Sequence, residues 1–117
     1  MQKFLDGLKV KHSSANMINH TRLASGLVRK DPITTIHPLV RVHPITKERC
    51  IFINGEFITG AVGMKDVEWK MISDFLLQHI IGSHDIQARV HWSPRTIVMF
   101  DNRSTIRKLF QVILVRY

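Results

Sequence analysis

The sequence predicts a mainly β fold with helices, of the α+β class. Short apolar and β-branched runs alternate with turn residues along much of the chain, which is typical of strands. One long segment instead repeats its apolar residues at helical spacing. The 117 residues allow one domain at most, with fewer strand segments than the seven or eight of a complete two-sheet β fold.

The chain begins with a predicted helix followed by a predicted loop. Apolar residues from Phe4 to Val10 place a short amphipathic helix within residues 1–12, and Ser13-Ser14 ends it. Residues 15–31 are polar and show no apolar period, so we expect a loop or linker there.

A hairpin and a further strand are predicted next. Thr34–Val42 has the pattern of a strand, in which Pro38 indicates an edge position or a bulge. Cys50–Ile53 is predicted to return beside it and to end at Asn54-Gly55, a strong turn signal. Glu56–Thr59 is a further short extended piece.

The clearest helical pattern covers residues 66–81, inside a β-rich core predicted over residues 32–106. One apolar stripe runs along about four turns, and Gly82-Ser83 ends the helix. We expect this stripe to lie in the core, its methionine and phenylalanine included. It consists of Val67, Met71, Ile72, Phe75, Leu76 and Ile80.

The last third is predicted to contain a second hairpin. Its strands are Ile86–Trp92 and Thr96–Phe100, which end at the polar run Asp101-Asn102-Arg103. This run brings hydrogen-bonding side chains to one end of a sheet and is the first candidate for a site. After Asn102 the pattern fits either a helix or, at Phe110–Val115, a strand.

Composition and charge argue against several kinds of protein. The net charge of +8 comes from 17 basic and 9 acidic residues, but no basic run exceeds two, which favours a solvated basic surface over nucleic-acid binding. Cys50 is the only cysteine, so an intramolecular disulfide and a CxxC zinc site are excluded, and a buried structural thiol is favoured. Because neither a signal peptide nor a membrane-spanning run is present, we expect a soluble, cytoplasmic protein without a membrane partner.

Seven histidines raise the question of a metal site. No histidine is followed two residues later by Asp or Glu, and there is no HExxH motif. His37, His43, His91 and Asp101 are the residues that the fold could bring together. Surface or hydrogen-bonded histidines are favoured for each of them.

Several linked stretches resemble the taurine/alpha-ketoglutarate dioxygenase (TauD/TfdA) family. They follow the family's order and intervals, from the opening LLEGL helix through the hairpin HPLVRTHPxTG…LFVN and the step GFT to the motifs FQVRxxWxPGD and WDNRxTxH. In this sequence they are Lys3–Leu8, His37–Thr46 with Ile51–Asn54, Glu56–Ile58, Ile86–Pro94 and Asp101–Thr105.

The resemblance implies a partial double-stranded β-helix of jelly-roll type, with Fe(II) and 2-oxoglutarate as cofactors of an oxygenation reaction. Family substrates are small sulfonates, sulfate esters or aryloxy acids. The phenylalanine of the GFT step lines the family's substrate pocket, and that role carries over to Phe57. Iron is held by a His-x-Asp pair before the region matched here and by a distal histidine that ends the DNRxTxH motif. An arginine about a dozen residues further on holds 2-oxoglutarate.

This sequence departs from the family at the metal. No His-x-Asp pair is present, and the distal-histidine position is Arg107, whose guanidinium cannot ligate iron. Residues 107–117 form a divergent tail. We therefore expect the C-terminal part of such a domain, incomplete, inactive alone and binding neither cofactor. Lys47 and Arg95 are smaller departures, since the family has glycine at both positions.

Two other functions stay open. A catalytically dead remnant would serve as a binding or oligomerisation module, because a partial jelly roll leaves open sheet edges that pair with other chains. A basic nucleic-acid binder is the weaker alternative and requires an affinity that falls with salt.

Overall fold

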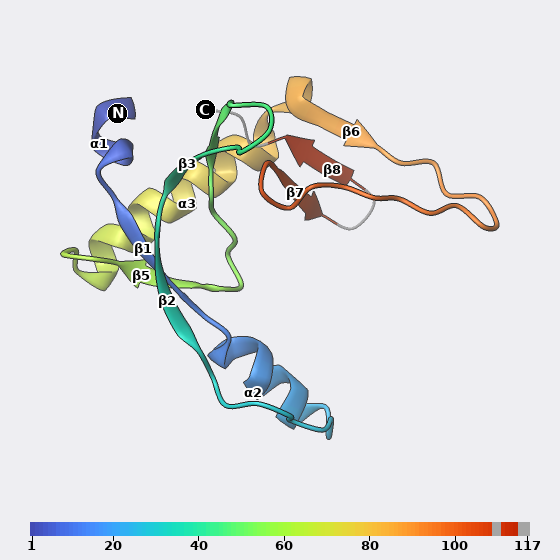
Figure 1. Cartoon of the computed structure of the whole chain (residues 1–117), viewed down its shortest axis with the longest axis horizontal. Helices are drawn as coiled ribbons and strands as arrows, with labels where there is room; N and C mark the ends of the chain where they lie inside the picture. The colour runs from blue at the N-terminus through green and yellow to red at the C-terminus, as the bar shows by residue number, and fades with distance from the viewer. Residues whose placement is uncertain (109–110, 115–117) are drawn as a thin grey trace.

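A computed structural model of the chain describes residues 1–108 and 111–114 (Figure 1). Within these residues, short antiparallel sheets combine with helices, which confirms a mixed α and β fold. The strand orders are β2-β1-β5, β3-β4 and β6-β8-β7. In chain order the elements are α1 (Gln2–Asp6), β1 (Lys9–Ser13), α2 (Ala15–Leu23), β2 (Thr34–Pro38), β3 (Val40–Val42), β4 (Arg49–Ile51), β5 (Ile58–Ala61), α3 (Asp66–Gly82), the 3₁₀ turn η1 (His84–Ile86), β6 (Gln87–Arg89), β7 (Thr105–Lys108) and β8 (Gln111–Leu114).

The predicted helix over residues 1–12 is wrong beyond Asp6. Gly7 caps α1, and Lys9–Ser13 forms the central strand β1 instead, paired with β2 on one side and β5 on the other. Val10 and Ser13 are buried on this strand while Lys9 and Lys11 are exposed. Pairing with two distant strands therefore overrides a short helical pattern.

The loop predicted for residues 15–31 is also wrong in its first half, which forms α2. None of the α2 residues is buried. A helix that buries no face shows no apolar period in its sequence, and this is why the pattern did not reveal it.

The strand predicted over Thr34–Val42 is divided in two by Leu39. The Leu39 side chain is fully buried, its N–H donates to Leu8 O at 2.9 Å, and its carbonyl accepts from Phe52 N at 2.6 Å. Pro38 is the last residue of β2, an edge strand, which confirms its predicted edge position. β3 and β4 form the predicted hairpin, closed by His43 N–H donating to Glu48 O at 2.8 Å.

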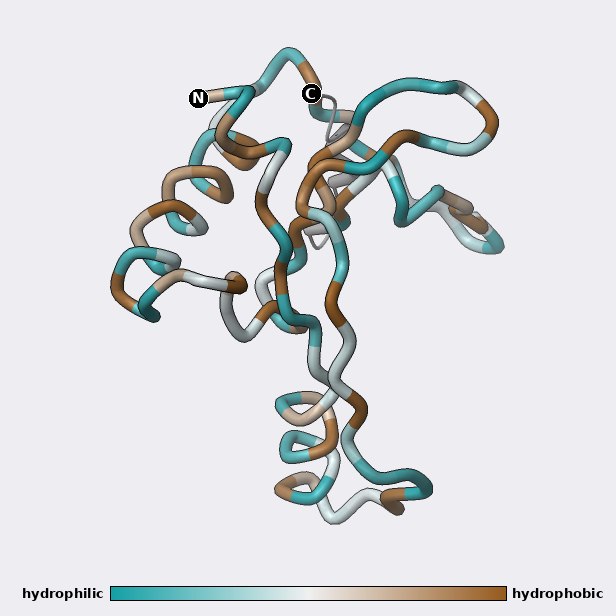
Figure 2. Tube along the Cα trace, turned by 60° about the vertical axis from the view of Figure 1, so that its left-hand side comes forward, coloured by the Kyte–Doolittle hydropathy of each residue, from teal (hydrophilic) through white to brown (hydrophobic). Residues whose placement is uncertain are grey.

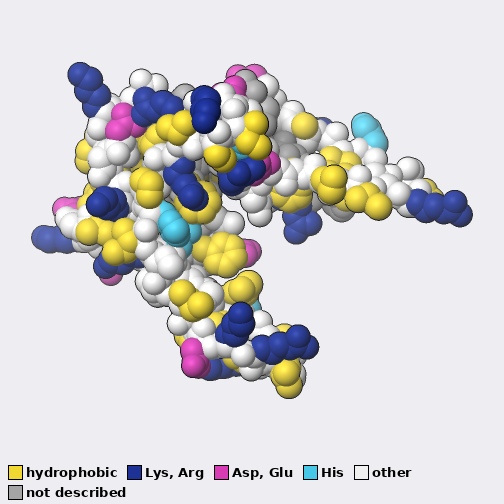
Figure 3. Space-filling view, in the orientation of Figure 1, with side chains coloured by type: hydrophobic (Ala, Val, Ile, Leu, Met, Phe, Trp, Pro, Cys, Tyr) yellow, Lys and Arg dark blue, Asp and Glu magenta, His cyan; other side chains and the backbone are white. Residues whose placement is uncertain are grey.

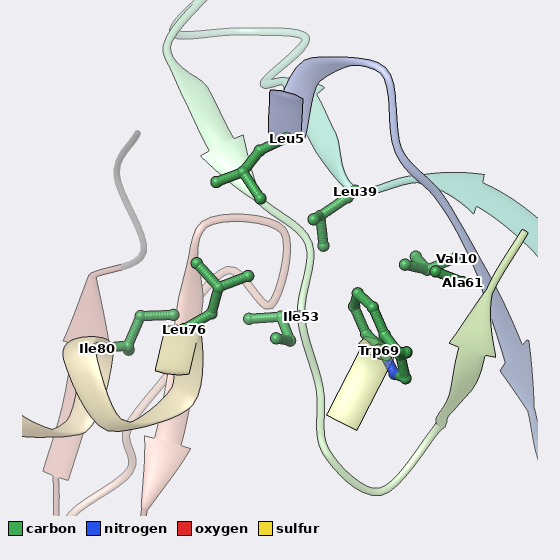
Figure 4. Close-up of a cluster of buried hydrophobic side chains, with 8 residues drawn as sticks. All are labelled: Leu5, Val10, Leu39, Ile53, Ala61, Trp69, Leu76 and Ile80. Carbon is green, nitrogen blue, oxygen red and sulfur yellow. The ribbon is translucent and has the colours of Figure 1, made fainter. Parts of the chain in front are cut away.

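Helix α3 confirms the prediction for residues 66–81 and extends it to Gly82. Its buried residues Trp69, Leu76 and Ile80 pack into the core shown in Figure 4, together with Leu5, Val10, Leu39, Ile53 and Ala61. Val67, Met71 and Phe75 are 73%, 71% and 54% exposed, so their predicted core position is wrong. The apolar stripe is wider than the single helix face that the small sheets cover.

The connections on either side of α3 follow the prediction only in part. Asn54-Gly55 begins a turn, with Ile58 N–H donating to Asn54 O at 3.1 Å, but the next strand is Ile58–Ala61 rather than Glu56–Thr59. The thiol of Cys50 is buried, which confirms its structural character.

The second hairpin is wrong. β6 pairs with β8, more than twenty residues away, and Thr96–Phe100 belongs to a long connection between β6 and β7. Of the two interpretations after Asn102, the strand is confirmed at Gln111–Leu114, whereas Phe110 and Val115 lie outside the described residues.

Two parts of the chain project from the body (Figures 1 and 2). One carries α2 and its connection to β2, and the other is the long connection between β6 and β7. Along the described residues, none of the helices has the length and apolar character needed to cross a membrane.

Candidate functional site

A cleft of about 690 Å³ opens beside β1. Its walls come from β1, from the connection between β4 and β5, and from the segment that leads into β7. The lining residues are His12, the residues 51–57, Phe100, Asn102, Arg103 and the residues 105–107. Phe57 and Arg107, the two positions singled out by the family resemblance, thus line the same cleft.

Asp101 organises the wall that carries Arg107. Its carbonyl accepts hydrogen bonds from Thr105 N at 3.0 Å, Thr105 Oγ1 at 2.6 Å and Ser104 N at 3.2 Å. Its carboxylate accepts from Arg103 Nε at 2.9 Å and Arg103 Nη2 at 2.6 Å, and from the Arg103 backbone N–H at 2.9 Å. The start of β7 is therefore tied to a single residue.

His43 links this wall to the hairpin of β3 and β4. Its ring is 7% exposed, and Nδ1 accepts hydrogen bonds from the backbone N–H groups of Ile45 at 3.3 Å and Thr46 at 3.1 Å. Because Nδ1 is an acceptor, the ring proton sits on Nε2, which donates to Asp101 Oδ2 at 3.0 Å. This bond joins two of the stretches that carry the motif resemblance, His37–Thr46 and Asp101–Thr105.

The charge of Asp101 is stabilised by these partners. The Arg103 side chain, then the His43 ring and then the Arg103 backbone N–H hold the pKa of the Asp101 carboxyl well below its usual value. Asp101 is therefore an anion throughout the physiological pH range, and the Arg103 guanidinium forms an ion pair with it.

His12 contributes an aromatic group to the opposite wall. Its ring stacks on Phe52 with centroids 4.7 Å apart, and the His37 ring meets it edge-on at 5.2 Å. The Arg41 guanidinium lies 4.5 Å from the centroid of the Phe52 ring. Burial, then the nearby His37 and Arg41, lower the pKa of His12, so the ring is neutral at pH 7.

His12 Nε2 is buried and has no hydrogen-bond partner among the described residues. His12 was not expected in a site, because the sequence pattern assigned its segment to a helix. The alternation of exposed Lys9 and Lys11 with buried Val10 is the signal that identifies a strand and its two faces.

The histidines considered as metal ligands are brought together only in part. His43 meets Asp101, His37 meets His12, and His91 takes part in neither group. Along the part of the chain that the structure describes, no three His, Cys, Asp or Glu side chains are grouped to hold a metal ion. Arg107 adds no ligand, because a guanidinium has no free electron pair to donate. The residues present do not fit an iron site.

Two sequence departures coincide with unusual backbone. Lys47 has φ +61° and Arg95 has φ +70°, in the left-handed region that disfavours side chains with a Cβ. The resembling family pattern has glycine at both positions, and the geometry explains that preference. Both turns thus adopt a backbone conformation that favours glycine although their residues carry a Cβ.

Comparison with known proteins identifies relatives of the chain. The profile of the family described as taurine catabolism dioxygenase TauD, TfdA family matches residues 1–106. An alpha-ketoglutarate-dependent sulfonate dioxygenase of Saccharomyces cerevisiae is 40% identical over 103 residues, which cover 88% of this chain and 25% of that protein. The alpha-ketoglutarate-dependent dioxygenase cnsM of Penicillium expansum is 40% identical over 89% of this chain and 30% of its own length. A putative sulfonate dioxygenase of Schizosaccharomyces pombe is 33% identical over 92% of this chain and 28% of its own length.

The chain thus spans between a quarter and a third of the length of these relatives. The family match covers nearly the whole chain and agrees with the motifs at Asp101–Thr105 and His37–Thr46. This chain belongs to the TauD/TfdA family.

Proposed function

We propose that the chain supplies the C-terminal part of an Fe(II)- and 2-oxoglutarate-dependent dioxygenase domain of jelly-roll type, and that it has no dioxygenase activity alone. The substrate we propose is a small sulfonate, because relatives in S. cerevisiae and S. pombe carry that description. Location in the cytoplasm stays a prediction from the sequence.

One observation supports the proposal that the chain has no dioxygenase activity alone. Arg107, at the position that the resemblance gives to the distal iron ligand, lines the same cleft as Phe57, the position that the resemblance gives to the substrate pocket. A fixed cation in this position repels Fe(II) instead of binding it. The cleft thus retains a candidate substrate wall while the metal ligand is replaced.

An assay of turnover tests the proposal. The purified chain is mixed with Fe(II), ascorbate, 2-oxoglutarate and taurine, and succinate release is measured, with the S. cerevisiae relative as a positive control. We expect no succinate above the rate without protein. Arg107→His is expected to be equally inactive, because the chain contains no His-x-Asp pair to complete the ligand set. Release of succinate by the unmodified chain, in proportion to its concentration, would overturn the proposal.

A non-catalytic binding module is the second candidate, and the open sheet edges favour it. In the part of the chain that the structure describes, β2 and β5 are the edges of one sheet. Such edges present unpaired backbone groups to another chain. Nucleic acid is a less suitable partner, because Lys and Arg side chains are scattered over the face shown in Figure 3 rather than gathered in a stripe.

A further inference from the structure

One arm of the chain, residues 14–33, projects from the body and is closed at its base (Figure 1). It contains α2 and the connection from α2 to β2. At the base, the Ser14 N–H donates to Ile33 O at 3.1 Å, and the Ile33 N–H donates to Ser14 Oγ at 3.0 Å. These bonds join the two ends of the arm, and the turn after α2 forms its far end (Figure 1).

The turn at the far end has a defined backbone. The N–H groups of Ala24 and Gly26 donate to His20 O at 3.0 Å and to Thr21 O at 2.8 Å. Ser25 has φ +56°, in the left-handed region that residues with a Cβ rarely adopt. A Cβ on Gly26 would lie 2.8 Å from Thr21 Cγ2 and 3.1 Å from Thr21 O, so this close approach requires glycine. The turn is therefore a built part of the fold that fixes the side chains on either side of it.

Apolar side chains are exposed on both sides of this turn. Leu23, just before it, and Leu27, just after it, are 85% and 80% exposed. α2 buries none of its residues, and a cavity of about 310 Å³, lined among others by Met17, Ile18 and Ile33, lies between α2 and the returning segment. The arm thus leaves most of its own apolar surface uncovered. Apolar side chains grouped in this way are typical of a contact surface.

Basic side chains lie beside the two leucines. Arg22, Arg29 and Lys30 are exposed, and among the described residues none of them forms an ion pair. Asp31 is the one acidic residue in the sequence of the arm. Figure 3 shows basic and apolar side chains together at the far end of the arm. This surface therefore suits a partner that is negatively charged and also offers an apolar layer.

The shape and charge of the far end select among anionic partners. Nucleic acid would pair with the cations but would leave the leucines without an apolar contact. A second copy of the chain has a net charge of +8 and would be repelled. The far end is convex and stands clear of the other elements in Figures 1 and 2, so a flat surface can reach it. An anionic lipid surface provides negative headgroups and hydrocarbon together.

We propose that the far end of the arm docks on the surface of an anionic lipid bilayer. Leu23 and Leu27 enter the boundary between headgroups and acyl chains, and Arg22, Arg29 and Lys30 lie among the headgroups. The expectation of no membrane partner rested on the lack of a signal peptide and of a membrane-spanning run, and surface docking requires neither. Neither the cleft nor an iron site takes part, so this inference goes beyond the proposed function and is tested separately from it.

Co-sedimentation with lipid vesicles tests the docking. The complete chain is mixed with vesicles of phosphatidylcholine alone or of phosphatidylcholine and phosphatidylserine in equal parts. We expect binding to the phosphatidylserine vesicles to be at least tenfold tighter than to phosphatidylcholine alone and to weaken as salt is added. On the vesicles, amide hydrogen exchange of residues 22–30 should slow, whereas exchange in α3 should not change.

A pair of charge variants tests whether the arm makes the contact. Arg29→Gln combined with Lys30→Gln should weaken binding to phosphatidylserine vesicles at least tenfold, since each cation near an anionic surface contributes about fivefold. Lys3→Gln combined with Lys9→Gln is the matched control. It removes the same charge from exposed positions on α1 and β1, and it should weaken binding by no more than about twofold.

A pair of apolar variants tests whether the leucines enter the lipid. Leu23→Gln combined with Leu27→Gln should weaken binding at least tenfold while the dependence on salt persists. Val67→Gln combined with Met71→Gln, on the outer face of α3 at 73% and 71% exposure, is the matched control and should leave binding unchanged. All the substituted positions are exposed, so each variant is expected to keep its fold, which circular dichroism checks.

Three outcomes would overturn the docking. Absence of binding to both kinds of vesicle would exclude a lipid surface and point to an acidic protein partner instead. An equal loss of binding in the two charge variants would show a general attraction of a basic protein to anionic vesicles. An equal loss in the two apolar variants would show that the leucines of the arm have no special role.

Discussion

Replacing Lys47 with glycine is expected to stabilise the protein, although the change removes a side chain. Lys47 adopts φ +61° in the turn between β3 and β4, where its N–H donates to His43 O at 3.0 Å. A residue with a Cβ loses about 1–2 kcal/mol in this conformation, and glycine does not. Glycine also gives the unfolded chain more freedom, which costs about 0.4–1 kcal/mol. The expected net gain in the free energy of unfolding is about 0.5–1 kcal/mol.

Lys47→Ala is the matched control, because it removes the same charge and the same long side chain but keeps the Cβ. Urea unfolding followed by tryptophan fluorescence measures both variants, since Trp69 is buried in the core and reports its disruption. Lys47→Gly should unfold at higher urea than Lys47→Ala and the unmodified protein. If alanine stabilises as much as glycine, the gain comes from lost charge, and the explanation by backbone strain is refuted. Arg95→Gly provides an independent repeat at φ +70°.

Three further predictions concern the core and the histidines. Leu39→Ala, at a fully buried position, should lower the free energy of unfolding by about 2–5 kcal/mol, while Val42→Ala, at 60% exposure, should change it by less than about 0.5 kcal/mol. His43→Gln keeps a donor near Nε2 but removes the Nδ1 acceptor of the backbone amides of residues 45–46. Hydrogen exchange of these two amides should therefore be faster in His43→Gln than in His43→Asn. Equal exchange rates in the two variants would contradict the assigned tautomer. The pKa of His12 is lowered in the folded state, so as pH falls below 6.5 the unfolded state binds a proton that the folded state does not, and stability falls. His12→Phe should remove that part of the loss, seen as a smaller drop in urea midpoint between pH 7.5 and 5.5 than in the unmodified protein; an equal drop would exclude His12 as its source.

The parts of the fold that local pattern predicts are those whose interactions are local. Helix α3 is recognisable because its hydrogen bonds and its apolar face lie within seventeen consecutive residues. The hairpin of β3 and β4 is recognisable because six residues connect its strands. The partner of β6 is not, since β8 lies more than twenty residues away and nothing in Gln87–Arg89 specifies it. α2 escapes detection for a different reason, namely that it buries no residue.

The candidate site likewise combines residues that a local motif identifies with a residue that only the fold places there. Phe57 and Arg107 were selected by motif resemblance, and their shared cleft depends on contacts between segments fifty residues apart. His12 carries no motif of its own. Its place in the cleft follows from the pairing of β1 with β5, across a register shift between Lys11 and His12. Only the three-dimensional pairing of these strands places that ring in the cleft.

In this protein, the bonds that position residue 107 do not depend on the chemistry of its side chain. Thr105 is buried and bonded to Asp101, Asp101 is held by His43 and Arg103, and Arg107 follows two residues later on β7. None of these anchoring bonds involves the side chain of residue 107. An arginine at this position therefore leaves the scaffold that presents it intact, although its guanidinium has no electron pair to donate to a metal. The frame around residue 107 does not depend on that residue's own side chain, because the bonds that build the frame are made by Asp101.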